Sequence, residues 1–597
     1  MLDILLKNGN IADGRGTEIF RGDVAISDGR ICGVRREEEP PLEDGQAAEV
    51  IDCTGKLIAP GFIDIHSHGD MTAAAFPEME SYVLQGVTTF FGGQCGMSAA
   101  PADRYWRYTF FEDAAFEKII PPPCGGQIPG RGQLLETEKL RPAFKEVFGF
   151  DLDWTHTGEF FDHLEKVGIG VNMLSSVGHG QIRNQVMGTD DRREATQEEL
   201  GRMEELLEVA LENGAAGMSI GLDYEPGVYA SDQELMRMAR CLARNGRMLT
   251  VHCQRRNFRH GEYRKQYYIN GLKEALEIGR KTGVRLHISH LACGYEVAPG
   301  DSEMEREAAR RTLEIIEKYR SRGVDVTWDV IPEGCGGEMF CLPYLASKFQ
   351  PYVDWCGGFD GFAEKLNTGS YRRQLAEEIE RGGHRSVSPF TNLDPVEDPE
   401  WGHHVFIKEF CKEKFNGRSI HEISEKLGMS DVNGALEVLS DDPRTRCVSD
   451  RRAHYPGADY YTDRKDAAVC IDGGQFNYSW PYEKDRPVIF PAPSTYCGMV
   501  KFLKNEIKKG ADVSETVAKM TGNSAGKIGL SDRGIIGEGM CGDCVVIDLD
   551  ELDPRESYTE PESVPSGIDY VIVNGVIEAD HGRALHRKAG KILRAPF

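Results

Sequence analysis

The chain has 597 residues, more than one hydrophobic core accommodates, so at least two domains are expected. Hydrophobic residues make up 40% and charged residues 28% of the sequence, as in ordinary globular proteins. The formal net charge of −26 is spread along the chain, which argues against nucleic acid or an anionic membrane as a partner.

Targeting signals and membrane spans are not expected. The N-terminus, MLDILLKNGNIADGRG, alternates like a strand and lacks the basic start and long apolar core of a signal peptide. No apolar run approaches the roughly 20 residues of a membrane span. The 16 cysteines have no repeating spacing, so we expect reduced thiols, with Cys541 and Cys544 of CGDC structural. The sequence therefore predicts a cytoplasmic protein.

Short runs of alternating apolar and polar residues occupy both ends of the chain. DILLKNG, GDVAISDGRICGV and EVIDCTGKLIAPG lie at the start, and GDCVVIDLDEL and IDYVIVNGVIEADHGRAL near the end. Glycine and aspartate separate these runs, as they separate strands of an antiparallel sheet. We expect residues 1–58 and 522–597 to form one small β-sandwich domain around an inserted domain.

Between these ends, apolar strands alternate with helical stretches. ATQEELGRMEELLEVALENG and DSEMEREAARRTLEIIEKYRSRG are two of the charged helical segments. Alternating β and α segments of this kind predict an α/β fold, a (β/α)₈ TIM-like barrel over residues 59–521. The eight candidate strands are GFIDIH, VTTFFGG, IGVNMLSSVG, AAGMSIG, MLTVHC, RLHISH, DVTWDV and AAVCIDG.

Two spacers in the barrel are too long for single helices. Residues 105–153 and 338–465 are rich in aromatic residues, proline and glycine, and are interpreted as insertions over the barrel mouth. RYWRYTFFEDAAF in the first insertion fits either a lid or a subunit interface. A homo-oligomer is therefore one possibility, and the oligomeric state stays open.

Side chains that bind metals follow the predicted strands, at the end of a barrel where active sites are built. His66 and His68 in IDIHSHGD differ by two positions, so both point to one face. The candidate ligands are His66, His68, Cys95, His252, His290 and Asp472. Imidazoles with a thiolate and a carboxylate make a site suited to zinc.

Cys95 in TTFFGGQCGMSAAP has two interpretations. A free cysteine usually behaves as a small buried hydrophobe. A thiolate facing imidazoles at a zinc site is instead deprotonated and binds the metal. Because other candidate ligands follow four further strands, the metal-ligand interpretation is favoured.

These motifs also carry a resemblance. The sequence resembles the amidohydrolase superfamily and, within it, the N-acyl-D-amino-acid deacylase (D-aminoacylase) branch. HxH followed by GGQCG is specific to this branch. The matching stretches follow the family's order over nearly the whole chain: APGFIDIHSH, GVTTFFGGQCGMSAAP, VGHGQIRNQVMG, GAAGMSIGLDYEPGVYAS, ISHLACG, KMTGNSAGKIGLSDRGIIGEGMCGD and GIDYVIVNG.

The resemblance implies a zinc-dependent barrel with a small β-sandwich. Cys95, His252 and His290 would hold a tightly bound zinc ion. His66 and His68 would form a weaker or vacant second site, with Asp472 beside both. Zinc lowers the pKa of water and polarises a carbonyl, and Asp472 would accept the proton and deliver it to the leaving amine.

The sequence departs from the family where the substrate's α-carboxylate is usually bound. Leu291 and Ala292 follow His290 in place of His-Lys, and Ile331 and Glu333 stand at the tyrosine positions of YPYTAGS. PAPSTYCG lacks the arginine of the family's HPR stretch, and Gln254 replaces another arginine. These departures indicate a changed substrate, and Glu333 in the pocket would favour a cationic or hydrogen-donating group.

Other residues of these motifs are candidates for substrate binding, with Arg255 or Arg256 as the candidate for a relocated carboxylate clamp. The candidates are His179, Arg183, Tyr224, Arg255, Arg256 and Glu333. The leading hypothesis is a zinc-dependent hydrolase of an amide bond in a small N-acyl amino compound. The alternatives are an amidohydrolase acting on a cyclic amide, amidine or cationic substrate, and an inactive scaffold.

Overall fold

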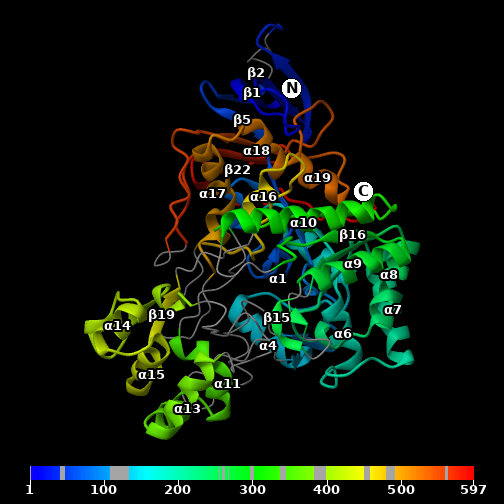
Figure 1. Ribbon diagram of the computed structural model, residues 1–597. Helices are drawn as coiled ribbons and strands as arrows, with labels where there is room; N and C mark the ends of the chain where they lie inside the picture. The colour runs from blue at the N-terminus through cyan, green and yellow to red at the C-terminus, as the bar shows by residue number, and fades with distance from the viewer. Residues whose placement is uncertain are drawn as a thin grey trace.

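The computed structural model has two main bodies, and a sheet built from both chain ends lies above a barrel of parallel strands (Figure 1). It describes residues 2–40, 47–107, 134–253, 256–257, 262–266, 268–295, 301–335, 344–381, 399–449, 457–478, 491–557 and 562–596.

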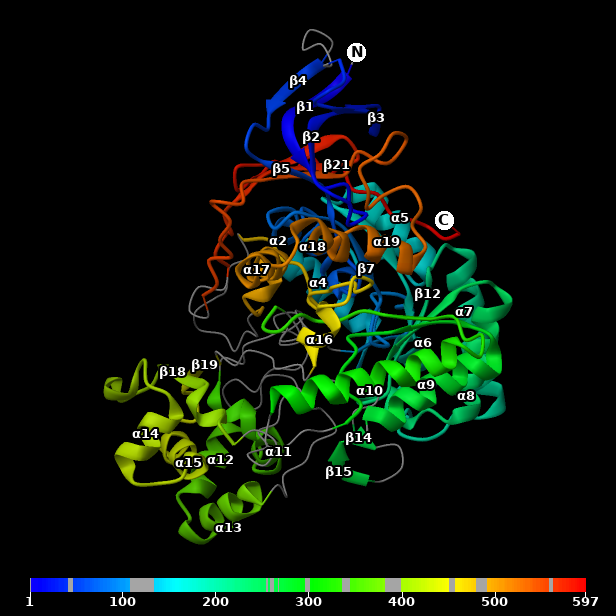
Figure 2. The same ribbon diagram turned by 45° about the horizontal axis from the view of Figure 1, so that its top comes forward.

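Strands from the two ends of the chain share one nine-stranded sheet. Figure 2 shows the blue N-terminal strands beside the red C-terminal ones. The junction is antiparallel, with Ala59 of β5 opposite Val545 of β20. Apolar residues from both ends, including Leu6, Val24 and Val546, form one buried core. The strands are β1 (Leu2–Ile11), β2 (Phe20–Ser27), β3 (Arg30–Arg36), β4 (Ala47–Asp52), β5 (Leu57–Pro60), β20 (Cys544–Ile547), β21 (Ile568–Val573), β22 (Val576–Asp580) and β23 (Arg583–Ala584).

All eight predicted barrel segments are found, seven of them as strands. The third segment is divided into two strands, β10 and β11. The eighth is a parallel bridge between Val330 and Val469. The Asp472 N–H then donates to the carbonyl of His66 at 3.1 Å, which joins the last segment to the first. The strands are β6 (Phe62–Asp64), β7 (Val87–Gly92), β10 (Asn172–Ser175), β11 (Val177–Gly178), β12 (Gly217–Gly221), β13 (Met248–His252), β16 (Arg285–Ile288) and β17 (Val326–Trp328).

Helices cover the barrel where the sequence predicts them. Thr196 and Glu199 form a capping box at the start of α7, and Leu200, Met203 and Leu207 make its buried face. The barrel helices include α1 (Gly69–Thr72), α2 (Glu80–Val83), α5 (Thr157–Val167), α6 (His179–Met187), α7 (Gln197–Glu212), α8 (Asp232–Arg244), α9 (Tyr268–Thr282), α10 (Ser302–Arg320), α17 (Ser494–Lys509), α18 (Val513–Met520) and α19 (Gly522–Ile528).

The C-terminal tail after β23 leaves the sheet and binds the barrel. The N–H of Gly590 donates to the carbonyl of Ile169, and the N–H of Leu593 to the carbonyl of Met173 on β10. The N–H of Ala595 donates to the carbonyl of Gly214, just before β12. The tail thus lies between β10 and the segment entering β12.

The two predicted insertions contain their own elements. The first pairs β8 (Tyr105–Arg107) with β9 (Leu134–Glu136) ahead of α4 (Thr137–Phe148). The second forms a helical lobe at the far end of the molecule from the terminal sheet (Figures 1 and 2). Its main elements are α11 (Gln350–Trp355), α12 (Phe359–Leu366), α13 (Gly369–Glu380), β18 (Val405–Glu409), α14 (Ile420–Leu427), α15 (Asp431–Asp441) and β19 (Arg446–Ser449).

The fold is α/β, a TIM-like barrel with a small β-sandwich domain from both termini, as predicted. The exact domain boundaries stay a prediction, since α19 and the C-terminal tail both contact the barrel. Every cysteine within the described ranges is a free thiol, Cys541 and Cys544 included. Among the helices that the structure describes, none combines the length and apolarity needed to cross a membrane.

Candidate metal centre

The six predicted ligands gather at the carboxyl ends of the barrel strands, and their donor atoms form two overlapping groups. Within each group the ligand atoms lie within 4.8 Å of one another, and Cys95 is common to both. One group contains His66, His68, Cys95 and Asp472, and the other contains Cys95, His252 and His290.

Cys95 lies between imidazole rings from three strands. Its Sγ is 3.2 Å from Nε2 of His66, 3.4 Å from Nδ1 of His252 and 3.5 Å from Nε2 of His290. These side chains are buried, so little water reaches the cluster. The sequence-based hypothesis that Cys95 faces imidazoles therefore agrees with this geometry.

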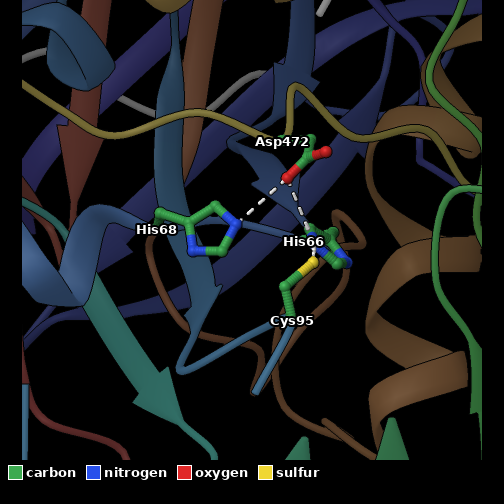
Figure 3. A group of neighbouring side chains, drawn as sticks. All are labelled: His66, His68, Cys95 and Asp472. Carbon is green, nitrogen blue, oxygen red and sulfur yellow. Dashed lines mark hydrogen bonds and ion pairs between the residues drawn. The ribbon is translucent and has the colours of Figure 1, made fainter. Parts of the chain in front are cut away.

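Asp472 joins the two histidines of the HxH motif. Its Oδ1 is 3.2 Å from Nε2 of His66 and 3.2 Å from Nε2 of His68 (Figure 3). The Asp472 side chain is 14% exposed, against 0% for His66 and 1% for His68.

The spacing of the donor atoms fits a tetrahedral zinc ion. Zn–S and Zn–N bonds of about 2.3 and 2.05 Å at a tetrahedral angle separate sulfur and nitrogen by about 3.6 Å. The observed distances from Cys95 Sγ to His252 and His290 are 3.4 and 3.5 Å. The thiolate and imidazole donors are also those that zinc prefers.

Three of these residues have left-handed backbone conformations, which non-glycine residues rarely adopt. The φ angles are 56° at Cys95, 35° at His290 and 55° at Asp472. Hydrogen bonds hold each one: Tyr224 Oη donates to the carbonyl of Cys95, and the His290 N–H donates to Asp329. The Asp472 N–H donates to His66, so the fold fixes these ligands before any metal arrives.

The charges in the cluster favour deprotonated donors. Burial raises the pKa of the Cys95 thiol, but His66 and His252 outweigh burial and hold that pKa well below its usual value. Burial likewise opposes the charge on Asp472, yet His66 and His68 hold its pKa far below the usual range. A thiolate and a carboxylate are the forms that bind a metal.

The pKa values of the imidazoles are shifted by the same burial and the same neighbouring charges. Burial lowers the pKa of His68 and of His252, but Cys95 and a carboxylate near each ring raise both values to about 9. The pKa of His290 is lowered by burial and by the nearby His252.

Buried carboxylates behind the ligands were missed by sequence reasoning. Asp329 follows β17, and its Oδ2 lies 2.7 Å from Nε2 of His287 and 3.8 Å from Nδ1 of His66. Asp223 follows β12, and its Oδ2 lies 3.3 Å from Nε2 of His252. Both residues stand at strand ends, so the rule that found the ligands could also have found them.

Comparisons with known proteins point to amidohydrolases. A model of the amidohydrolase family matches residues 49–263. An N-acyl-D-glutamate deacylase of Alcaligenes xylosoxydans xylosoxydans is 26% identical over 99% of this chain and 96% of its own length. A D-aminoacylase of the same organism is 24% identical over 99% of this chain and 97% of its own. Residues 49–263 of this chain therefore resemble the amidohydrolase family.

Solved structures share this fold. A D-aminoacylase crystal structure has a TM-score of 0.67 at 23% identity, with all of both chains covered. An N-acyl-D-glutamate deacylase from Bordetella bronchiseptica, complexed with zinc and a phosphonate inhibitor, has a TM-score of 0.64 at 24% identity over all of both chains.

His179 and Arg183 on α6 belong to a buried cluster with Glu234 of α8. Nε2 of His179 is 2.7 Å from Oε1 of Glu234, and NH1 of Arg183 is 2.6 Å from Oε2. All three side chains are fully buried. The structure thus pairs both predicted substrate-binding residues with a carboxylate of the protein itself, and their role toward a substrate stays a prediction.

The other candidate substrate-binding residues lie in different places. Tyr224 Oη donates to the carbonyl of Cys95 at 2.7 Å, next to the metal cluster. Glu333 is half-buried on the turn after Val330. Arg256 lies in the short strand β14 (Arg256–Asn257), and Arg255 lies outside the described residues.

Proposed function

We propose that this protein is a zinc-dependent hydrolase of an amide C–N bond that deacylates a small N-acyl amino compound of the N-acyl-D-amino-acid type. The observation that carries the proposal is the buried ligand cluster centred on Cys95. Relatives aligned over 99% of the chain are named as deacylases of N-acyl-D-glutamate and N-acyl-D-aspartate.

We assign the tighter zinc ion to Cys95, His252 and His290, and a weaker second site to His66, His68 and Asp472. A bound zinc ion supplies Lewis acidity, which polarises a carbonyl and lowers the pKa of water. The two imidazoles of the HxH motif hold Asp472 ionised, with its Oδ1 fixed 3.2 Å from both rings.

Asp472 is the general base of the proposed reaction. Its carboxylate accepts a proton from water as the water oxygen attacks the amide carbonyl. The protonated carboxyl then donates that proton to the amide nitrogen as the C–N bond breaks. The products are a carboxylic acid and a free amine, so amine release measures the reaction.

A second candidate substrate class rests on the turn after His290. Leu291 and Ala292 there have uncharged aliphatic side chains, so neither supplies a cation for an α-carboxylate. This observation favours a cyclic amide, an amidine or a cationic amide as the alternative substrate.

The test is hydrolysis by the zinc-loaded protein on two substrate sets, with the Asp472→Asn variant as the inactive control. The first set contains N-acetyl and N-formyl amino acids of both hands, and the second contains amides, amidines and cyclic ureides without an α-carboxylate. We expect product from the D-configured members of the first set. Turnover of the second set alone would replace that substrate class with the alternative, and turnover of neither would contradict the proposal.

A cytoplasmic location and a homo-oligomeric state also stay among our proposals. Their support is the charge distribution and the composition of the insertions.

A further inference from the structure

His252 uses its two ring nitrogens differently. Nδ1 faces Cys95 at 3.4 Å, while Nε2 faces Oδ2 of Asp223 at 3.3 Å. Both side chains are buried, at 8% and 4% exposed. A neutral imidazole carries one proton, so a carboxylate that accepts the proton on Nε2 leaves the lone pair of Nδ1 for a metal ion.

The ring of His252 is also held from both sides. The Tyr224 ring lies 5.2 Å away at 70°, and the His290 ring lies 4.5 Å away at 77°. The Tyr224 hydroxyl reaches past His252 to donate to the carbonyl of Cys95 at 2.7 Å. Two adjacent residues therefore contact two ligands of the same group.

The loop that carries Asp223 and Tyr224 packs tightly against the Cys95 backbone. A Cβ atom on Gly221 would lie 2.3 Å from the carbonyl oxygen of Cys95, and one on Gly227 would lie 1.9 Å from the carbonyl oxygen of Gly221. Only glycine fits at these two positions, which closes the loop on itself and fixes the direction of Asp223.

We propose that Asp223 and Tyr224 are positioning residues for the zinc site of Cys95, His252 and His290. Asp223 fixes the tautomer and the direction of His252, and Tyr224 fixes the left-handed backbone of Cys95. Asp223 acts through His252, which belongs to one ligand group, while Asp472 lies 3.2 Å from both His66 and His68, so the effect of Asp223 is specific to one site. The inference rests on the proposed zinc dependence, not on the identity of the substrate.

The test is the zinc dissociation constant of each site, measured by chelator competition on Asp223→Ala, Asp223→Asn and Tyr224→Phe. Loss of a carboxylate behind a ligating histidine weakens metal binding about 10- to 100-fold. We expect that loss in Asp223→Ala for the tighter site, with the weaker site unchanged. Asp223→Asn keeps an oxygen that accepts from Nε2 and should restore most of the affinity.

Cobalt substitution gives a second measurement. Its result should stay unchanged if Asp223 and Tyr224 only stabilise the fold. The thiolate-to-cobalt charge-transfer band reports the Cys95 bond, and we expect it to shift in Tyr224→Phe and Asp223→Ala but not in Asp191→Ala. Asp191 is a matched control, because it is a buried carboxylate paired with Arg107 outside the metal cluster.

Wild-type affinity in Asp223→Ala would overturn the proposal, as would equal weakening in Asp223→Ala and Asp223→Asn. If the wild-type protein binds zinc and hydrolyses no amide, the proposed function fails while this inference stands. If a variant does not fold, as judged by circular dichroism, Tyr224→Phe still tests the loop, because it removes one hydroxyl and keeps the ring.

Discussion

Cys95 is the residue that the two ligand groups share. Its Sγ lies within 3.5 Å of three imidazole nitrogens, and the left-handed backbone at this position aims the thiol at them. The same contacts hold the thiol pKa well below its usual value against the effect of burial. A change at this one atom therefore acts on both ligand groups.

We expect Cys95→Ser to lose most of the tightly bound zinc, because a neutral hydroxyl is a much poorer ligand than a thiolate. The measurement is zinc content after dialysis, by elemental analysis. Cys32→Ser, at an exposed thiol of the terminal sheet, is the control and should keep its zinc. Full zinc content and full activity in Cys95→Ser would contradict the ligand role.

Asp472→Asn separates proton transfer from metal binding. The amide keeps the shape of the side chain but cannot accept a proton, so we expect amide hydrolysis to fall about 10²-fold or more. Zinc in the Cys95, His252 and His290 site should stay bound. Asp466→Asn, at an exposed carboxylate a few residues earlier, is the matched control, and equal activity of the two variants would exclude Asp472 as the base.

At the scale of elements, α6 and α8 are joined by the buried cluster of Glu234 with His179 and Arg183. Removing one partner of a buried ion pair typically destabilises a protein by about 3–5 kcal/mol, because the remaining charge stays buried without compensation. We expect a loss of this size in Glu234→Ala, measured by urea unfolding. Glu208→Ala, at a partly exposed position on α7, should change stability little.

Lys527 on α19 contributes to the pH dependence of the free energy of unfolding, and its lowered pKa fixes the sign of that contribution. Burial lowers its pKa from 10.5 to about 8, and its Nζ donates to the carbonyl of Trp328 at 2.6 Å. Between pH 8 and 10.5 the folded state has lost this proton and the unfolded state has not. The contribution of Lys527 to the free energy of unfolding should therefore rise with pH across that range, by at most about 3 kcal/mol.

The measurement is denaturant unfolding of the wild-type protein and of Lys527→Met from pH 7 to 10. Methionine keeps an apolar stem in place and cannot titrate, so this contribution should vanish in the variant. A wild-type slope that persists in Lys527→Met would assign the pH dependence to another group.

The barrel could be predicted because its strands recur in the sequence, and the ligand positions could be predicted because they follow those strands. Apolar strands recur at regular intervals, and His66, His252 and His290 stand directly at or after strand ends. Asp329 also stands at a strand end, so its place near the site was open to the same rule, but which ligand it contacts is decided by three-dimensional proximity. The sequence also gives no sign of whether Arg183 points to a substrate or to Glu234.

At the scale of the whole molecule, the tail after β23 could not be predicted either. Residues 588–597, KAGKILRAPF, have no alternating pattern, and the tail binds the barrel through its backbone. Its position depends on free backbone groups of β10, which a sequence does not display.

Deleting residues 588–597 should destabilise the barrel, although the deletion removes none of the candidate metal ligands. Four backbone hydrogen bonds join the tail to Ile169, Met173 and Gly214. At roughly 1 kcal/mol each, their loss costs on the order of 4 kcal/mol. The measurement is the midpoint of thermal unfolding. Arg594→Ala is the control, because it removes the ion pairs to Asp162 and Glu165 and the contact with the Phe161 ring but keeps the backbone hydrogen bonds. An unchanged midpoint in the deletion variant would contradict this role.

The pairing of β5 with β20 has a consequence for synthesis on the ribosome. Strands β1 to β5 leave the ribosome first, yet their partner β20 follows only after the whole barrel. Until then β5 presents an unpaired edge, which is the kind of surface that aggregates. We therefore expect the nascent chain to depend on chaperones that shield this edge, and to fold slowly, because its decisive contacts join the first and last tenths of the chain.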